Sequence, residues 1–182
     1  MNPIWQTDFV VAQTVCLARS LKHWTGRELL PTHFGAPASG TACSTGLPAH
    51  AVPEAGAPPI GKIPNIFAKN IFHAPFVVMS HGMEADPVLN YGNAAALALW
   101  EMSWEELTRT PSRLTAEAPN REERAKLLEA VTRRGFIDDY SGVRISKSGR
   151  RFRISRATVW NLLTADGKPC GQAAMFNRWE FI

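Results

Sequence analysis

The sequence lacks the features that mark membrane-spanning and disulfide-rich secreted proteins. No apolar run in its 182 residues approaches the roughly 18 residues that a transmembrane helix needs. The amino terminus has no basic stretch followed by a continuous apolar segment, which argues against a secretory signal. Its three cysteines, Cys16, Cys43 and Cys170, are odd in number and far apart, so they fit neither a disulfide framework nor a CxxC metal site. We therefore predict a cytoplasmic protein with reduced thiols and no membrane association.

The signatures of common enzyme classes are missing as well. There is no GxSxG nucleophile elbow, no P-loop and no GxGxxG stretch. The adjacent carboxylates at 105–106 and 138–139 are not acid–base pairs by spacing, because sequence neighbours point in different directions on a helix or strand. No metal-binding set such as HxxxH is formed by the five histidines, which are His23, His33, His50, His73 and His81. We expect no catalytic residue and no metal, and predict that the chain is not an enzyme.

Positive charge is concentrated in one part of the chain. The net charge is +4, yet residues 121–156 hold eleven Lys or Arg against five Asp or Glu. A local basic surface can bind nucleic acid or an acidic partner, but arginines on exposed strand faces are also common. In the stretch RRFRI, a period of two puts Phe152 and Ile154 on one face and Arg151 and Arg153 on the other. We interpret it as an amphipathic strand and do not expect nucleic-acid binding.

The amino-terminal part divides into a helix and a linker. Residues 1–30 contain an amphipathic stripe spaced four, three, four and three apart, formed by Val10, Thr14, Leu17, Leu21 and Trp24. Residues 31–62 hold eleven Pro or Gly among 32 residues and bury too little apolar surface to offset the entropy of ordering. We predict an N-terminal amphipathic helix followed by a disordered Pro/Gly-rich linker or insertion.

Residues 63–182 show the pattern of an α+β domain. Two short strands are predicted at 76–79 and 87–91, followed by a helix at 94–102 and a capping box from Ser103 to Glu106. A helix at 121–134 is ended by Gly135, and three strands follow at 140–146, 150–163 and 171–179. The elements predict a five-stranded antiparallel sheet with helices on one face.

Three stretches carry a family resemblance: APFVVMSHGMEADPVLNYGNAAALALWEMSWEELTRTPSRLTAE, NREERAKLLEAVTRRGFIDDYSGVRISKSGRRFRI and ATVWNLLTADGKPCGQAAMF. In this order they resemble the MEKHLA domain family. That family is a PAS-related group found in bacterial proteins and at the carboxyl end of plant class III homeodomain-leucine-zipper proteins. The resemblance implies a PAS-like fold for residues 63–182 and, as in plants, a regulatory role that controls dimerisation. It implies no established catalytic residue.

Neither of two familiar PAS cofactors is indicated. PAS domains that hold flavin for photochemistry use a cysteine after the first helices, and the comparable stretch TPSRLT has Ser112 at that place, whose hydroxyl is far less nucleophilic. Haem-binding PAS domains need an axial ligand, usually His, on the helix that here spans 121–134, and this stretch has none. The sequence therefore assigns no cofactor, whose identity is unknown.

Six residues are candidate contacts to a small organic ligand between the helices and the sheet: Tyr91, Arg113, Tyr140, Trp160, Asn161 and Gln172. The amides of Asn161 and Gln172 supply both donors and acceptors to the edge of a planar ring, if they face the helices. Alternatively, both amides face solvent or hold a loop in place.

The remaining candidates also have plain structural alternatives. Arg113 can bind an anion bidentately, or it can pair with Glu117 or Asp138. Aromatic side chains line small-molecule pockets, but Trp160 can equally fill the core and the two tyrosines can hydrogen-bond across strands. His81, beside Gly82, is expected either at a pocket mouth or hydrogen-bonded to the backbone of a turn.

These patterns favour a non-catalytic PAS-like sensory or protein-interaction module that binds a small organic ligand. The alternatives are a structural dimerisation scaffold with a filled core and, less favoured, an unusual enzyme. PAS-like sheets commonly dimerise through a flanking helix. We therefore expect a homodimer or a protein partner at the helix face formed by Val10, Leu17, Leu21 and Trp24.

Overall fold

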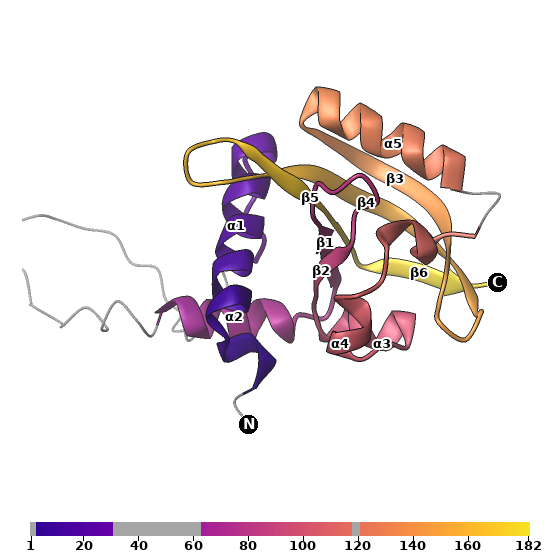
Figure 1. Ribbon diagram of the computed structural model, residues 1–182, viewed down its shortest axis with the longest axis horizontal. Coiled ribbons are helices and arrows are strands. Elements are labelled where there is room, and N and C mark those ends of the chain that lie inside the picture. Colours follow the sequence, from indigo (N-terminus) through magenta and orange to yellow (C-terminus); the bar gives the residue numbers. More distant parts are fainter. Residues whose placement is uncertain (1–2, 31–62, 118–120) are drawn as a thin grey trace, which may run out of the picture.

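The computed structural model describes residues 3–30, 63–117 and 121–182, so the predicted linker at 31–62 lies outside the described residues. The helical elements are η1 (Ile4–Gln6), α1 (Asp8–Thr25), α2 (Ile63–Phe72), α3 (Ala94–Trp100), α4 (Trp104–Leu107), η3 (Ser112–Thr115) and α5 (Arg121–Arg134). The strands are β1 (Val77–His81), β2 (Leu89–Gly92), β3 (Phe136–Ile145), β4 (Arg151–Leu163), β5 (Pro169–Phe176) and β6 (Arg178–Phe181). Figure 1 shows α1 and α2 on one side of the sheet, with α3, α4 and α5 on the other.

The strands form one antiparallel sheet in the order β2-β1-β5-β4-β3, and β6 pairs with β4 beside this path. The second half of β4 pairs with β5, as in Asn161 opposite Gln172, and the first half pairs with β6, as in Phe152 opposite Phe181. The predicted α+β arrangement around a five-stranded antiparallel sheet is confirmed. The strand predicted at 171–179 is divided in two, because the chain bends at Asn177 before it pairs with β4 again.

The inner face of the sheet, which faces α3 and α5, carries an aromatic cluster. Trp100 at the end of α3 is 1% exposed, and its ring lies edge-on to Phe152 and Phe176 with centroids 5.1 and 6.2 Å apart. The predicted alternation along β4 is confirmed: Phe152 and Ile154 are buried on this face, whereas Arg151 and Arg153 are exposed. The apolar residues of β4 therefore form the floor on which the helices pack.

Asn93 joins the start of α3 to the sheet and to α2. Its side-chain oxygen accepts hydrogen bonds from the backbone N–H groups of Ala96 and Val78, at 3.1 Å each. Its amide nitrogen donates to the carbonyls of Ile71 and Phe76, at 3.3 and 2.6 Å. The side chain is fully buried and all its hydrogen-bonding groups have partners, which explains how a polar residue is accommodated there.

The predicted boundaries of two other helices are also confirmed. Ser103 and Glu106 form a capping box at the start of α4, with each side chain bonded to the backbone of the other residue. Helix α5 ends at Gly135, which has a φ of +91°. A Cβ at Gly135 would overlap the indole ring of Trp24, so glycine is required there both for the left-handed backbone and for the approach of α1.

Helix α1 covers the outer face of the sheet. It buries Val10, Leu17 and Leu21 completely against this face, and the indole N–H of Trp24 donates to the carbonyl of Asn161 at 2.9 Å. The helix face predicted as a dimer interface is therefore occupied by the chain's own sheet. The amphipathic stripe was correctly placed on one side of a helix, but its apolar surface is buried without a second copy.

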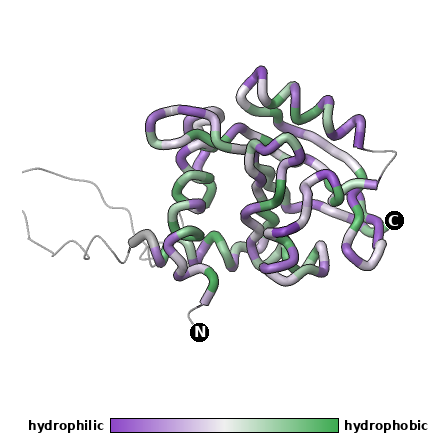
Figure 2. Tube along the Cα trace, viewed as in Figure 1, coloured by the Kyte–Doolittle hydropathy of each residue, from purple (hydrophilic) through white to green (hydrophobic). Residues whose placement is uncertain are grey.

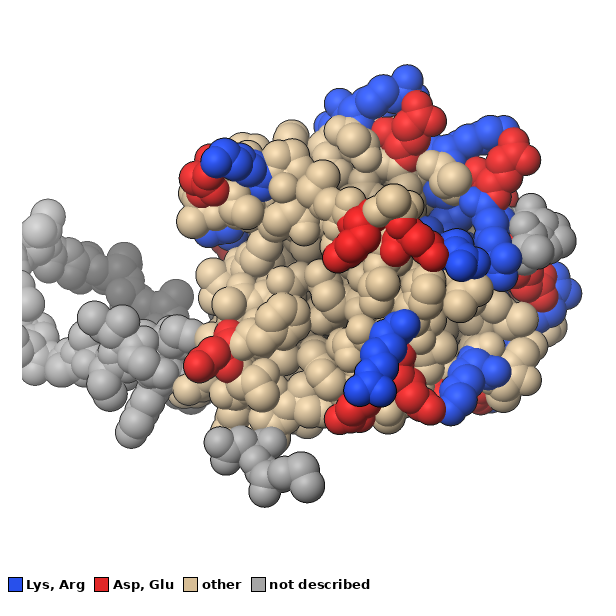
Figure 3. Space-filling view, in the orientation of Figure 1, with Lys and Arg blue, Asp and Glu red and all other residues tan. Residues whose placement is uncertain are grey.

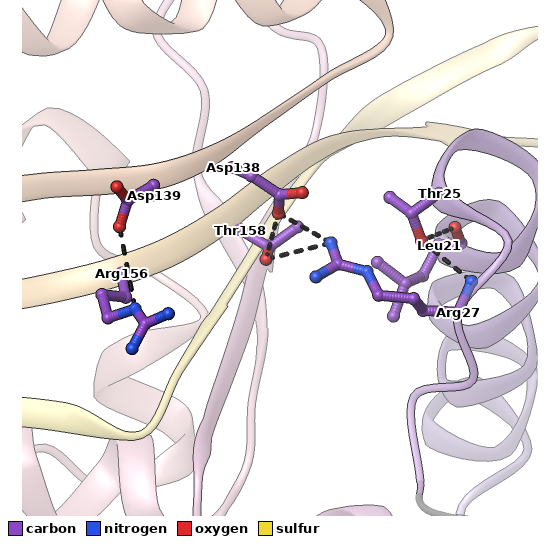
Figure 4. A network of polar contacts seen from close by, with 7 residues as sticks. All are labelled: Leu21, Thr25, Arg27, Asp138, Asp139, Arg156 and Thr158. Atoms are coloured by element: carbon purple, nitrogen blue, oxygen red, sulfur yellow. Dashed lines mark hydrogen bonds and ion pairs between the residues drawn. The ribbon is translucent and has the colours of Figure 1, made fainter.

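Strand β3 is irregular where it meets β4, with register shifts on both sides of Tyr140 and a positive φ of 60° at Asp139. Asp138 lies on the α1 side of this bulge. Its carboxylate accepts hydrogen bonds from Arg27 and from the Thr158 hydroxyl, both at 2.7 Å (Figure 4). The contact links the segment after α1 to strands β3 and β4.

The charged surface is mixed rather than uniformly basic. Figure 3 shows Lys and Arg intermixed with Asp and Glu around α5, next to a broad area with few charges.

Along α5 the tube alternates between hydrophilic and hydrophobic residues, as expected for a helix buried on one side (Figure 2). None of the helices in the described ranges combines the length and the apolar content that a membrane span requires.

Candidate ligand-binding site

A cavity of about 50 Å³ lies between helix α5 and the inner face of the sheet. Its lining residues come from β1 to β5 together with α3, η3 and α5. One water needs roughly 10–15 Å³ of such space, so the cavity has room for about four waters or a ligand of similar size. In this conformation it is too small for the three fused rings of a flavin.

Arg144 and Tyr140 on β3 form a polar part of the cavity wall. Arg144 donates through Nη2 to the Tyr140 hydroxyl at 3.1 Å and through Nη1 to the carbonyl of Val143 at 2.8 Å. Gly142 leaves space for this pair, because a Cβ there would overlap the Tyr140 hydroxyl. Arg144 is 6% exposed, and no carboxylate in the described ranges forms an ion pair with it. It is a buried cation held only by neutral groups.

Helix α5 places a second guanidinium group, that of Arg124, at the same cavity. Burial, followed by the positive charge of Arg144, lowers the pKa of Arg124 to about 10. None of the acidic side chains that the structure describes pairs with Arg124 either. Two like charges therefore line one partly open cavity, and no carboxylate of the described residues compensates them.

Two further polar side chains in the wall have a ring nitrogen without a partner. His81 places Nδ1 2.8 Å from the carbonyl of Gly82, which makes Nδ1 the protonated nitrogen, and burial lowers the pKa of the ring. Its Nε2 and the indole N–H of Trp100 are buried and have no hydrogen-bond partner among the described residues. Both residues line the cavity. His81 thus meets both of its predicted alternatives, the backbone bond and the pocket.

The amides of Asn161 and Gln172 face the helices, as the ligand hypothesis required. Asn161 Nδ2 donates to the carbonyls of Val131 and Thr132 at the end of α5, at 2.9 and 3.3 Å. Gln172 Nε2 donates to the carbonyl of Leu128 and to Asn161 Oδ1, at 3.0 Å each. The two amides hold α5 on the sheet, and of the two only Gln172 also lines the cavity.

Two other candidates lie on the opposite face of the sheet. Tyr91 and Trp160 are fully buried in the cluster formed with α1, and the structure does not bring them to the cavity. Burial raises the pKa of Tyr91 far above its ordinary value. Trp160 therefore follows its plain alternative and fills the core. Neighbouring positions on a strand alternate between faces, which separates Trp160 from Asn161.

Arg113 also lies away from the cavity. It is half-exposed and pairs through Nε with both carboxylate oxygens of Asp86, at 2.9 and 3.0 Å. The two partners considered from the sequence are engaged elsewhere, Glu117 with Arg151 and Asp138 with Arg27. Of the six candidate contacts, the structure thus brings Tyr140 and Gln172 to the cavity wall.

Sequence reasoning missed the two arginines of the site. Arg124 precedes Leu127, Leu128 and Val131 at helical spacing, so the buried stripe of this helix extends to it. That spacing was the available signal. The sequence signal for Arg144 was weaker. The bulge before it interrupts the alternation of β3, so the sequence does not indicate which face of the sheet Arg144 occupies.

Comparison with known proteins shows both a family and a fold. Comparison with curated protein sequences gave no match. Among solved structures, the PAS domain of a protein from Colwellia psychrerythraea is similar with a TM-score of 0.53 and 14% identity, covering 63% of this chain and 92% of that one. An RNA-binding light-oxygen-voltage receptor has a TM-score of 0.56 and 14% identity, with 71% of this chain and 36% of that one covered.

At such low identity these neighbours show the fold, which is that of PAS domains. The MEKHLA domain family matches residues 59–181. The match covers more than half of the sequence and includes every element from α2 to β6. The chain therefore belongs to the MEKHLA domain family.

Proposed function

We propose that this chain is a non-catalytic sensory module that binds a small molecule in the cavity between α5 and the sheet. The observation that carries the proposal is the cavity itself. Close-packed interiors contain few voids larger than a water, and buried polar groups normally have partners. Here a void of about 50 Å³ coincides with polar side chains that lack them. A bound ligand accounts for both features.

A ligand bound in the cavity would affect the helix on the other side of the sheet through Asn161. Its side chain holds the last turn of α5, its backbone N–H donates to the carbonyl of Gly135 at 2.8 Å, and its carbonyl receives the indole N–H of Trp24. Two residues further along β4, the backbone of Leu163 is hydrogen-bonded to the side chains of Ser20 and Arg19 on α1, at 2.9 and 2.6 Å. A ligand that shifts α5 would therefore also shift α1.

The output of the module then passes from α1 to a protein partner or to a second copy of the chain. This route fits the regulatory role that the family resemblance implies. A dimer formed through Leu17 and Leu21 would first require α1 to leave its own sheet, since both side chains are fully buried. We therefore place the partner-binding event after a movement of α1, in a cytoplasmic protein.

Native mass spectrometry of the purified full chain tests the proposal. We expect one small molecule bound per chain, lost when Ala174→Leu adds three carbon atoms at the cavity wall. Ala125→Leu is the matched control, because Ala125 is exposed on the same helix that covers the cavity. If the wild type carries no molecule and its stability responds to none in a metabolite screen, a scaffold with an unused cavity is the correct description.

A further inference from the structure

We infer that the ligand of the proposed sensory site is a small organic carboxylate of about two to four carbon atoms, held by Arg124, Arg144 and Tyr140. The inference rests on the proposed function and names the chemical class of its ligand.

The charge of the site requires an anion. Four other arginines have acidic partners, among them Arg27 with Asp138, Arg113 with Asp86 and Arg151 with Glu117. Within the described ranges, the two arginines of the cavity have none. An unpaired charge removed from water is costly unless a counterion accompanies it. A bound anion supplies that counterion to both guanidinium groups together.

The donors at the site match a carboxylate. A guanidinium group presents planar N–H donors that fit the two oxygens of a carboxylate, and Arg124 has no hydrogen-bond partner among the described residues. The Tyr140 hydroxyl accepts from Arg144, so its own proton is free to donate to a ligand oxygen. The indole N–H of Trp100 is a further unpartnered donor in the wall.

The remaining wall favours a carboxylate over phosphate. Besides the arginines the wall has both polar and apolar side chains, and the apolar ones include Met79, Leu89, Leu127 and Ile154. A short hydrocarbon tail fits this apolar part of the wall, which offers no hydrogen-bond partner to the additional oxygens of a phosphate. The volume of about 50 Å³ limits the tail to a few carbon atoms.

Thermal unfolding of the full chain in matched ionic strength provides the test, with sodium propionate, propionamide and sodium phosphate as probes. Propionamide has the shape of propionate without its charge. We expect propionate to raise the melting temperature and the other two to leave it unchanged. Equal effects of propionate and propionamide would overturn the inference, and so would binding of phosphate in place of propionate.

Two variants assign the effect to the cavity. Arg124→Gln is expected to weaken propionate binding by about tenfold or more, since it removes a charge-assisted bond. Without propionate it is expected to be at least as stable as the wild type, because it removes the repulsion with Arg144. Arg133→Gln, exposed on the same helix, should bind propionate like the wild type. Unchanged binding by Arg124→Gln contradicts the inference.

The outcome separates this inference from the proposed function. A neutral molecule that copurifies with the chain and is lost in Ala174→Leu would overturn the carboxylate and leave the sensory module standing. Absence of any copurified molecule, together with no response to propionate, would overturn both.

Discussion

Asn161 connects helices that lie on opposite faces of the sheet. Its side chain holds the end of α5, and its backbone carbonyl receives Trp24 from α1. Removing the amide also leaves Gln172 without one acceptor. The importance of this residue follows from its place between two layers, rather than from contact with the ligand.

We expect Asn161→Ala to lower the free energy of unfolding by about 1–3 kcal/mol, because buried groups lose their hydrogen-bond partners. Urea denaturation followed by circular dichroism measures the change. Asn177→Ala, at the exposed bend between β5 and β6, is the matched control and should change stability by less than about 0.5 kcal/mol. Similar losses in the two variants would contradict the role of Asn161 as a junction.

His81 should make the stability depend on acid pH. Burial, and secondarily the charge of Arg124, lowers its pKa in the folded state, although the Gly82 carbonyl and Glu84 act in the opposite direction. The unfolded chain therefore binds a proton near the ordinary histidine pKa of about 6.5, where the folded chain does not. The contribution of neutral His81 to the free energy of unfolding is therefore present above that pH and is lost as the pH falls.

Urea titrations at pH 7.5 and 5.5 test this expectation. The loss of unfolding free energy between the two pH values should be smaller in His81→Gln than in the wild type, while His73→Gln, at an exposed position, should behave like the wild type. An identical pH dependence in His81→Gln and the wild type would show that His81 titrates normally.

Among single residues, sequence reasoning located the amides but could not choose the face of the sheet. Asn161 and Gln172 were predicted from their hydrogen-bonding capacity, and both do face the helices. Tyr91 and Trp160 were placed with them although they lie on the other face. Because helices cover both faces, buried residues occur on each, and the alternation of a strand alone does not identify the ligand side.

At the scale of elements, α1 is part of the core. Leu17→Ala should lower the free energy of unfolding by about 2–5 kcal/mol, because it leaves a cavity under the helix. Phe9→Ala on the exposed side of α1 should have a much smaller effect, since Phe9 is 53% exposed. Chemical denaturation together with light scattering distinguishes the alternatives. A Leu17→Ala chain that keeps its stability but changes from dimer to monomer would instead identify an interface.

The elements most accurately predicted have local signals. The capping box at Ser103 and the glycine after α5 fixed helix ends, and the turn residues between strands fixed the last hairpins. Helix α2 was not predicted, because it is only ten residues long and directly follows the Pro/Gly-rich stretch. Strand β6 was merged with β5, since only Asn177 separates them and both continue the same strand-like pattern.

For the whole molecule, the central claim is that the sheet couples the ligand cavity on its inner face to α1 on its outer face. The two helices α5 and α1 meet the same end of β4 through short polar contacts, and each is otherwise packed on its own side. This arrangement could not be derived from the sequence, because the contacts of α1 with β4 join residues more than one hundred positions apart, such as Trp24 and Asn161.

Hydrogen–deuterium exchange of the full chain with and without sodium propionate tests this claim most directly. Binding should slow exchange in α5 and also in α1, and Asn161→Ala should keep the first effect and lose the second. Slower exchange confined to α5 in the wild type, or no change in either helix, would contradict the account.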